Sequence, residues 1–566
     1  MSRLFNQHNV RAVTSLDGAW RFATDPENCG RESGYSTEIP GAETVIVPSV
    51  WNTKLGLMEY EGVAWYERDF YTDGGTLRFC FGAVMTYAEV YLDGKMIGSH
   101  YGGFCQFDAI ANQVSKGTHR LTVRVDNSFD EQSIPMTFVD WYHYGGITRS
   151  VSVESLSGVC VLNNRMEYTL SDDMTSACVR FAIELYNASE ISVSDTVKIS
   201  VLGNEVSYEA SLSPNERVTV LTDEINLCGF ELWSPKNPAL YDLKATTSTD
   251  DLFDKVGFRL VSVSDGKILL NGEPIELLGV NRHEEHPDFG FAFPDSLMQR
   301  DIDIALNMGC NTIRGSHYPN AQVFVDMLDR CGVTFWSEIP IWGCGFSPKS
   351  LEDPVVLERG AEMHREMVKY YYNHPSIIIW GMHNEIPSET PESVGMASSY
   401  YKLLKEQGGN RIVTFATNHA MDDLCMEYCD VICLNQYQGW YVGDIDSWVD
   451  FVNDFRARRK TLGMEHKPVI MSEFGAAAVY GHNSFDTVRW SEQYQSRLIE
   501  KCLTLFHDDP MIVGMYIWHF ADMITSNDAG LTRARGYNNK GLLNEYRKPK
   551  TSYFTTAELY KKFAKP

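Results

Sequence analysis

Hydrophobic and polar positions alternate over short stretches in the first 262 residues. Residues 88–100 (AEVYLDGKMIGSH) and 118–127 (THRLTVRVDN) have the period of two that is typical of half-buried strands. Asp93-Gly94 in the first stretch is a strong local signal for a hairpin turn. Similar but smaller stretches continue over residues 159–262. The pattern predicts two consecutive β-sandwiches, and the short strands of the second suit an immunoglobulin-like sandwich.

The pattern changes after residue 262, where short apolar runs alternate with longer amphipathic stretches. Eight runs are predicted strands: 277–283, 311–315, 334–338, 376–381, 412–417, 431–436, 469–474 and 513–519. The stretches 296–309, 324–332, 356–373 and 491–507 between them are helix-like. Eight strands that alternate with helices over about 300 residues predict a (β/α)₈ barrel. We therefore expect three domains, at residues 1–158, 159–262 and 263–566.

Polar side chains stand at the ends of the predicted barrel strands, and the C-terminal ends of such strands form the active face. The strand-end residues are Asn281, Arg282, His283, Arg314, Glu338, Asn384, Glu385, Asn435, Glu473 and His519. We expect these side chains to converge on one mouth. The aromatic residues predicted to ring it are Tyr318, Trp342, Tyr437, Trp440, Tyr441 and Trp518.

Two of these residues are glutamates that directly follow an apolar strand. Glu385 follows IIIWGMHN and Glu473 follows PVIMS. A single glutamate at such a position commonly forms an ion pair or anchors a loop, but two on the fourth and seventh strands favour joint chemistry. Retaining glycoside hydrolysis needs a pair of carboxyl groups about 5–5.5 Å apart, one that protonates the leaving oxygen and one that attacks the anomeric carbon.

Composition and charge restrict the partners and the compartment. The formal net charge of −26 argues against nucleic-acid binding, and any acidic ligand would have to be held by a local cation. The 13 scattered cysteines favour reduced thiols in a cytosol. No apolar run is long enough to span a bilayer, and the opening residues have no secretory signal. We expect a cytoplasmic protein without membrane partners.

Two residue groups raise the alternative of a metal site. Cys425, Cys429 and Cys433 are spaced by four, which matches no usual zinc or iron–sulfur pattern. His283 and His286 are three apart without the helical arrangement of zinc hydrolases, so His283 is interpreted as a wall residue of the mouth. Paired carboxylates complete glycoside hydrolysis alone, so we expect no metal and no cofactor.

Four motifs resemble glycoside hydrolase family 2: GVNRHEEHP (279–287), NTIRGSHYPN (311–320), NHPSIIIWGMHNE (373–385) and PVIMSEFG (468–475). The resemblance spans essentially the whole chain. It implies a sugar-binding-like jelly roll, an immunoglobulin-like sandwich and a (β/α)₈ TIM barrel, in the order read above. It also implies that Glu385 is the acid/base and Glu473 the nucleophile, and that the protein forms a homo-oligomer, a dimer or a tetramer.

Within the family, three stretches resemble microbial β-glucuronidases: 433–444, 516–526 and 538–554. The resemblance makes Asn538 and Lys540 the residues that bind a uronic acid carboxylate, because a buried carboxylate needs a cation and a hydrogen-bond donor. The other substrate-binding residues that it implies are Asp140, His317, Asn384, Tyr437, Tyr441 and Trp518. The arginine usual four residues before the Asn is Ala534 here, flanked by Arg533 and Arg535, and we assign its role to Arg535.

The leading hypothesis is a retaining exo-β-glucuronidase that acts on a small-molecule or oligosaccharide glucuronide. β-Galacturonidase stays open because of the displaced arginine. β-Galactosidase stays open because GVNRHEEHP is closer to those enzymes. A non-catalytic carbohydrate-binding protein is the alternative from another class, although such a protein has no use for paired strand-end glutamates. For RGYNNKG (535–541), the simple alternative to a carboxylate site is a solvated turn.

Overall fold

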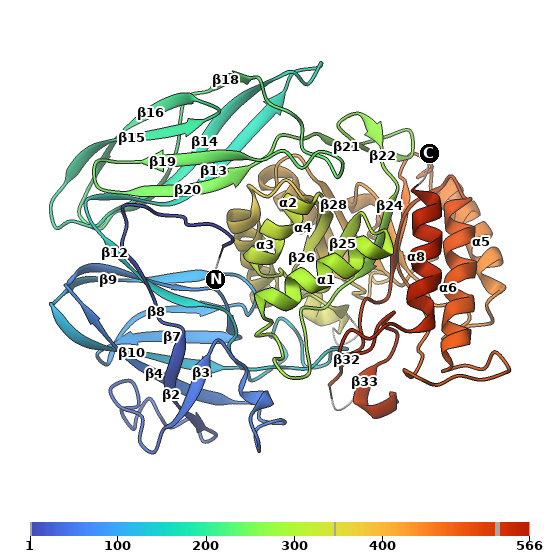
Figure 1. Cartoon of the computed structure of the whole chain (residues 1–566), viewed down its shortest axis with the longest axis horizontal. Coiled ribbons are helices and arrows are strands. Elements are labelled where there is room, and N and C mark those ends of the chain that lie inside the picture. Colours follow the sequence, from blue (N-terminus) through green and yellow to red (C-terminus); the bar gives the residue numbers. More distant parts are fainter. Residues whose placement is uncertain (1–2, 344–346, 527–531, 565–566) are drawn as a thin grey trace.

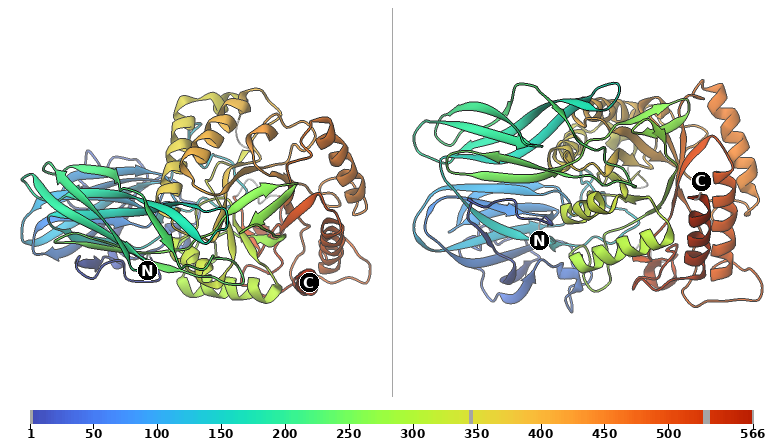
Figure 2. Two further views of the ribbon diagram at one scale, coloured as in Figure 1. Left: turned by 90° about the horizontal axis from the view of Figure 1, so that it is seen from above. Right: turned by 45° about the horizontal axis from the view of Figure 1, so that its top comes forward.

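The computed structural model describes residues 3–343, 347–526 and 532–564. Two β-sandwiches lie on the same side of a closed barrel, and the views of Figures 1 and 2 agree on this arrangement. The described part of the chain contains no helix that is long and apolar enough to cross a membrane. The architecture confirms the predicted order of two sandwiches followed by a (β/α)₈ barrel.

The first sandwich contains two larger sheets. The order β1-β12-β5-β9 comprises Val13–Ser15, Val151–Leu156, Gly75–Phe81 and Phe107–Val114. The order β3-β2-β4-β10-β7-β8 comprises Glu43–Val47, Gly18–Asp25, Val63–Thr72, Gly117–Asp126, Tyr87–Leu92 and Lys95–Tyr101. A pair formed by β6 (Val84–Met85) and β11 (Gly146–Ile147) and the 3₁₀-helix η1 (Trp51–Thr53) complete it. Asp93 and Gly94, with φ of 50° and 81°, form the predicted turn between β7 and β8.

The second sandwich also packs two sheets face to face. One contains β13 (Val159–Leu170), β14 (Ser176–Asn187), β17 (Arg217–Leu221) and β18 (Ile225–Cys228). The other has the order β16-β15-β19-β20, with Asn204–Leu212, Val193–Val201, Tyr241–Thr246 and Asp251–Val256. Alternate residues such as Phe181, Ile199 and Leu243 point inward and form its core, as the period of two predicts.

The barrel closes between β31 and β24, and all eight predicted strands are confirmed. Strands β24 to β31 are Leu277–Asn281, Thr312–Gly315, Thr334–Glu338, Ile377–Asn384, Ile412–Thr417, Ile432–Asn435, Val469–Phe474 and Ile512–Ile517. The helices are α1 (Asp295–Met308), α2 (Gln322–Cys331), α3 (Pro354–Tyr371), α4 (Glu392–Gln407), α5 (Ser447–Thr461), α6 (Glu492–His507) and α8 (Thr551–Phe563). Because helices cover the outer faces of parallel strands, the strands read as continuous apolar runs.

The barrel domain also contains a small sheet at one end of the barrel and several short elements. At the N-terminal end, the sheet of β21 (Val261–Ser264), β22 (Lys267–Leu270) and β23 (Glu273–Pro274) packs against barrel residues such as Trp336 and Ile379. Elements elsewhere in the barrel domain are η3 (Pro348–Glu352), η4 (Met426–Tyr428), η5 (Ala534–Gly536), β32 (Met523–Ile524) and β33 (Tyr537–Asn538). The pair β32–β33 places the segment around Asn538 beside the C-terminal end of β31.

One loop of the first sandwich, residues 127–145 between β10 and β11, extends to the C-terminal end of the barrel. Trp141 of this loop is buried in the barrel's own core cluster, and Ser526 donates a hydrogen bond to the Val139 carbonyl at 3.1 Å. Arg359 of α3 donates to the Gln132 carbonyl at 2.6 Å. These contacts fix Asp140, which lies between the anchored residues, at the barrel mouth.

Candidate active site

A cavity of about 560 Å³ lies where the barrel strands end at their C-termini. It brings together both strand-end glutamates, aromatic rings, amides and two cations. The lining residues are Phe138, Asp140, Trp342, Glu385, Asn418, Asn435, Gln436, Tyr437, Gln438, Tyr441, Val442, Glu473, Trp518, Thr532, Arg533 and Lys540. The predicted convergence of strand-end residues on one mouth is therefore confirmed for Glu385, Asn435 and Glu473.

Glu473, near the end of β30, is held in an ion pair. Arg314 donates to its Oε1 at 2.8 Å, and the Tyr437 hydroxyl donates to its Oε2 at 2.8 Å. Burial raises the pKa of Glu473, while the ion pair with Arg314 and the hydrogen bond from Tyr437 act in the opposite direction. Both contacts favour the charged form, so they prepare Glu473 to act as a carboxylate.

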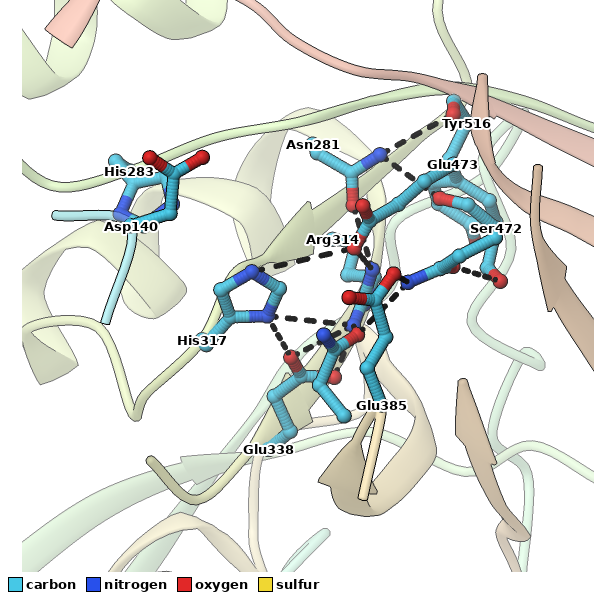
Figure 3. Close-up of polar contacts among 12 residues, drawn as sticks. Asp140, Asn281, His283, Arg314, His317, Glu338, Glu385, Ser472, Glu473 and Tyr516 are labelled. Atoms are coloured by element: carbon cyan, nitrogen blue, oxygen red, sulfur yellow. Dashed lines mark hydrogen bonds and ion pairs between the residues drawn. The ribbon is translucent and has the colours of Figure 1, made fainter. Parts of the chain in front are cut away.

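Arg314, from β25, is the centre of a buried network. Its guanidinium donates to Glu338 at 2.9 and 3.0 Å and to the side-chain oxygen of Asn384 at 2.7 Å. A further bond of 2.9 Å goes to the Asn281 side-chain oxygen. In Figure 3 this guanidinium lies among the carboxyl groups at the mouth. All five N–H groups of this planar cation are bonded, one of them to Glu473. The other four hold the guanidinium in place, so Glu473 is positioned more rigidly than an ammonium group would position it.

His317 belongs to the same network. Its Nδ1 lies 2.8 Å from Glu338, and its ring stacks on Trp518 with a centroid distance of 5.1 Å. Burial and the nearby Arg314 charge lower the pKa of His317 well below its ordinary value, so the ring is neutral. A neutral imidazole that donates through Nδ1 keeps Nε2 as an acceptor.

Glu385 follows β27 in a different environment. Asn435 donates its side-chain amide to Glu385 Oε1 at 2.8 Å, and the Glu385 backbone N–H donates to the Ala416 carbonyl at 2.9 Å. Burial, together with the charge of Glu473, raises the pKa of Glu385 to about 8. The two carboxyl groups thus differ as an acid and a nucleophile must: Glu385 retains its proton at neutral pH, whereas Arg314 stabilises Glu473 as an anion.

The backbone at Glu385 has a left-handed conformation with φ of 50°. Such conformations are uncommon for residues with a Cβ and occur preferentially at functional sites. Gly343, from the loop after β26, lies directly against this peptide: a Cβ at residue 343 would be 1.9 Å from the Glu385 carbonyl oxygen. The absence of a side chain at position 343 is therefore a condition for the position of Glu385.

Lys540 and Asn538 follow β31 in the chain, and β31 lies across the barrel from β27. Lys540 is 2% exposed, and its ammonium donates to the Tyr441 hydroxyl at 2.7 Å. Burial lowers the pKa of Lys540. Asn538, Asn539 and Lys540 are all buried, which excludes the solvated turn as a description of this segment.

Asp140 connects this group to the first sandwich. Asn538 donates to Asp140 Oδ2 at 2.9 Å, and Arg533 pairs with the same oxygen. Asp140 Oδ1 and the Nε–H of Arg533 are buried and have no hydrogen-bond partner among the residues that the structure describes. Burial raises the pKa of Asp140, and the positive charges of Arg533 and Lys540 oppose this rise.

Arg535 does not reach the cavity, and this corrects our assignment. Its guanidinium pairs with Glu545 at 2.8 Å and stacks on the Tyr537 ring at 5.2 Å. The physical reason is the backbone: Arg535 has φ of 62° within η5, which turns its side chain away from the direction of Arg533. Arg533, the other arginine that flanks Ala534, lines the cavity.

Several other predicted residues lie outside the lining of the cavity. Tyr318 is fully buried, stacks on Phe104 at 4.0 Å and bonds to His283 at 3.2 Å, while Trp440 packs against Trp490. Arg282 pairs with Asp301 of α1 on the outside of the strands. The predicted ring of aromatic residues is thus reduced to Trp342, Tyr437, Tyr441 and Trp518. Asn384 and His317 contact Arg314 behind the cavity.

The sequence assigned no particular contact to four residues that shape the site: Arg314, Glu338, Asn435 and Arg533. The first three were visible as strand-end polar residues. Their inward direction, opposite to that of Arg282, follows from the alternation of side chains along a strand once the register is known. For Arg533 the sequence carried no signal that separates it from Arg535, since both flank Ala534.

The residues of the two metal alternatives have separate partners. Cys425 contacts Ser393, Cys429 donates to the Met426 carbonyl and Cys433 contacts Thr414. His283 bonds to Tyr318, whereas His286 accepts from the backbone N–H of Asp288.

The fold and the cavity together define a class of protein. The closed barrel has one buried glutamate after its fourth strand, Glu385, which is protonated. A second, Glu473, lies near the end of the seventh strand and is paired with an arginine. This arrangement is that of a glycosidase with paired carboxyl groups.

Comparison with known proteins identifies the family. Residues 13–156, 161–259 and 261–565 match the profiles described as "Glycosyl hydrolases family 2, sugar binding domain", "Glycosyl hydrolases family 2" and "Glycosyl hydrolases family 2, TIM barrel domain". The chain belongs to glycoside hydrolase family 2, and it is a glycoside hydrolase.

The relatives include two kinds of uronidase. The β-glucuronidase of Paenibacillus borealis is 27% identical, with 96% of each chain covered. The structure of a β-galacturonidase from Eisenbergiella tayi bound to galacturonate superimposes with a TM-score of 0.92 at 31% identity, covering 99% of both chains. The β-glucuronidase of Ruminococcus gnavus superimposes with a TM-score of 0.87 at 26% identity, also with 99% coverage of both chains.

Proposed function

We propose that the protein is an exo-acting, retaining β-uronidase that releases terminal β-D-glucuronic acid from glucuronides. The observation that carries this proposal is the buried ammonium of Lys540 in the same cavity as Glu385 and Glu473. A carboxylate at C5 of the sugar supplies the counter-charge for Lys540 and accepts a hydrogen bond from the Asn538 amide. Curated β-glucuronidases that are similar over nearly the whole chain support the choice of sugar.

The two carboxyl groups perform the reaction in two steps. In the first, the Glu473 carboxylate forms an ester bond to the anomeric carbon while the bond to the leaving oxygen breaks and Glu385 transfers its proton to that oxygen. In the second, Glu385 removes a proton from a water molecule, whose oxygen attacks the anomeric carbon and releases Glu473 as a carboxylate. Two inversions retain the β configuration and regenerate both groups.

Lys540 also argues against neutral sugars. Its ammonium is buried, and a hexoside carries a hydroxymethyl group where a uronide carries the carboxylate. The hexoside therefore leaves the buried cation without a carboxylate of its own, because the nearby Asp140 is already paired with Arg533 and Asn538. For this reason we place β-galactosides below both uronides.

β-Galacturonide is the second candidate substrate. The specific observation in its favour is the similarity to the Eisenbergiella tayi β-galacturonidase, at a TM-score of 0.92 and 31% identity. Glucuronate and galacturonate differ only in the orientation of the hydroxyl at C4, next to the carbon that carries the carboxylate. The groups beside Lys540 that meet this hydroxyl, Asp140 and Arg533, therefore decide between the epimers.

The test compares kcat/KM for 4-nitrophenyl β-glucuronide, β-galacturonide and β-galactoside in the wild type and in Lys540→Ala. Loss of one partner of a buried charge pair costs about 2–5 kcal/mol, so uronide turnover should fall at least about 30-fold. Lys548→Ala, an exposed lysine of the same segment, is the matched control. Galactoside turnover equal to that of both uronides, or uronide turnover insensitive to Lys540→Ala, would refute carboxylate recognition.

A further inference from the structure

Some residues that line the cavity have no role in the proposed catalysis or in the proposed binding of the uronic acid, and we call the space beside them the outer part. Three amide side chains, which we call the amide wall, line this part: Asn418, Gln436 and Gln438. Aromatic and aliphatic side chains complete it: Phe138, Trp342 and Val442. Among the described lining residues, the charged ones are Asp140, Glu385, Glu473, Arg533 and Lys540, all of which belong to catalysis or to the uronic acid. The outer part is thus uncharged but rich in hydrogen-bonding groups.

The amide wall lies beside Glu385, the proposed acid/base. It is therefore expected to lie beside the leaving group, which Glu385 protonates. Asn435, which donates to Glu385 at 2.8 Å, directly precedes Gln436. The backbone N–H of Glu385 bonds to Ala416, two residues before Asn418. Because Glu385 protonates the leaving oxygen, the groups around Glu385 contact the part of the substrate that departs. Lys540, in contrast, is located after β31 and holds the sugar that remains on the enzyme.

Hydrogen bonds within the amide wall leave one acceptor without a donor. Gln436 donates its side-chain amide to the backbone carbonyl of Asn418 at 2.9 Å, and Gln438 donates to the Gln436 side-chain oxygen at 3.4 Å. The side-chain oxygen of Gln438 is buried and has no partner among the described residues. A buried acceptor without a donor is unfavourable by about 1–3 kcal/mol. Because Gln438 lines the cavity, rotation of its terminal amide brings this oxygen to a hydroxyl group of the leaving group and removes the penalty.

The apolar side of the same space is formed by flat rings. Trp342 and Phe138 have ring centroids 6.1 Å apart with planes inclined by 45°. Trp342 is fixed because its backbone pairs with that of Asn384, next to the acid/base. Flat apolar faces together with a few directed amides are suited to a ring that carries both C–H faces and several hydroxyl groups.

We propose that this outer part is a subsite for a neutral pyranose, so that the substrate is a uronosyl saccharide and not the conjugate of an apolar alcohol. The proposal rests on the proposed β-uronidase function and specifies its substrate class. An apolar leaving group would pack on Trp342 and Phe138 but would leave the Gln438 oxygen without a donor. A charged leaving group would find no counter-charge among the described residues of the outer part.

The test uses two primary-alcohol leaving groups of similar size, because the secondary hydroxyls of glucose are more acidic and would depart more easily without any subsite. kcat/KM is measured for β-uronosyl-(1→6)-glucose and for cyclohexylmethyl β-uronide, whose ring lacks hydroxyl groups. The disaccharide should exceed the cyclohexylmethyl uronide by about tenfold, the value of one or two net hydrogen bonds. Equal or faster turnover of the cyclohexylmethyl uronide would overturn the subsite and leave β-uronidase activity intact.

Variants connect the effect to the amide wall. Gln438→Leu and Asn418→Ala should each lower the ratio of disaccharide to cyclohexylmethyl kcat/KM by about five- to tenfold. Gln299→Leu, an exposed glutamine on α1, should leave the ratio unchanged. Residual turnover of the cyclohexylmethyl uronide shows that a variant is folded. A ratio unaffected by both amide-wall variants overturns the proposal, and failure of the wild type to hydrolyse any uronide overturns the β-uronidase function together with it.

Discussion

Arg314 lies 2.8 Å from the carboxylate of Glu473 and simultaneously holds Glu338 at 2.9 Å. One buried cation thus serves two carboxyl groups, of which only Glu473 lines the cavity. The other N–H groups of the guanidinium donate to the side-chain oxygens of Asn281 and Asn384, so the cation cannot turn toward one acid without losing contacts to others.

Arg314→Lys should lower kcat/KM for uronides by about 100-fold, because a lysine cannot reproduce the fork of hydrogen bonds that positions Glu473. With less stabilisation of its anion, Glu473 should titrate at higher pH. The acid limb of the pH profile of kcat/KM would therefore shift upward. An acid limb at the wild-type position in Arg314→Lys would show that Arg314 does not control the ionisation of Glu473.

Activity should decline above about pH 8, where Glu385 loses the proton that it gives to the leaving group. Glu385→Gln should lower kcat/KM by about 10²–10⁴-fold for alkyl uronides, which need protonation of the leaving oxygen in the first step. Dinitrophenolate leaves without a proton, so kcat/KM for a 2,4-dinitrophenyl uronide, which reports the first step, should be much less affected. Equal losses on both substrates would assign the acid to another residue.

The same ionisation links stability to pH. The folded-state pKa of Glu385, about 8, is above the ordinary value of 4.5, so the folded protein retains a proton that the unfolded chain releases. The contribution of Glu385 to the free energy of unfolding is therefore complete below pH 4.5 and is lost as pH rises through 8. Denaturant titrations at pH 5, 7 and 9 should show a smaller decrease in Glu385→Gln than in the wild type, and parallel decreases would contradict the raised pKa.

A 2-deoxy-2-fluoro uronosyl fluoride should label Glu473, since the fluorine slows breakdown of the ester intermediate. Peptide mass spectrometry locates the label, and Glu473→Gln serves as the unlabelled control. A label on Glu385 or Glu338 would reverse the assignment of the nucleophile. Hydrolysis with inversion, seen by NMR of the first product, would exclude the ester altogether.

The two arginines that flank Ala534 should behave differently. Arg533→Ala removes the cation that pairs with Asp140 and should lower uronide kcat/KM by at least about tenfold, the typical effect of losing a hydrogen bond to a charged group. It should also change the ratio between glucuronide and galacturonide. Arg535→Ala breaks only a half-exposed ion pair with Glu545 and should stay within about twofold of the wild type. The reverse order would restore Arg535 as the substrate contact.

Gly343→Ala should lower kcat by about 100-fold through displacement of Glu385, because the added Cβ would be 1.9 Å from the Glu385 carbonyl oxygen. Gly395→Ala on α4 is a matched control, since a Cβ at residue 395 meets nothing within 4 Å. Wild-type kcat in Gly343→Ala would mean that the peptide of Glu385 moves at no catalytic cost.

The sequence predicted the architecture well because buried parallel strands leave a strong pattern. Residues 376–381 and 469–474 are apolar because helices cover the outer face of each strand and the barrel interior covers the inner face. Glu385 follows the first of these runs and Glu473 lies within the second, and both face the mouth. The strand ends alone pointed to Glu385 and Glu473, whereas their roles of acid/base and nucleophile rest on the family resemblance and stay predictions. The oligomeric state, the cytoplasmic location and the retaining outcome stay predictions.

What the sequence could not predict depends on backbone direction over a few residues. Arg535 and Arg533 are equivalent in the printed chain, and only the positive φ of Arg535 within η5 separates them. Tyr318 and Trp440 are aromatic residues near the mouth in sequence, yet packing against Phe104 and Trp490 removes them from the cavity. The role of Gly343 required the distance to a peptide 42 positions further along the chain.

The loop 127–145 brings Asp140 from a sandwich into the barrel mouth, where Arg533 and Asn538 bind it. The barrel is therefore not a self-sufficient catalyst to which a sandwich has been attached. A chimaera that joins this barrel to the sandwich of a relative would inherit a foreign partner for Arg533. We therefore expect that exchange of sugar preference between relatives needs the transfer of residues 127–145 and 532–540 as one unit, although they are nearly four hundred positions apart.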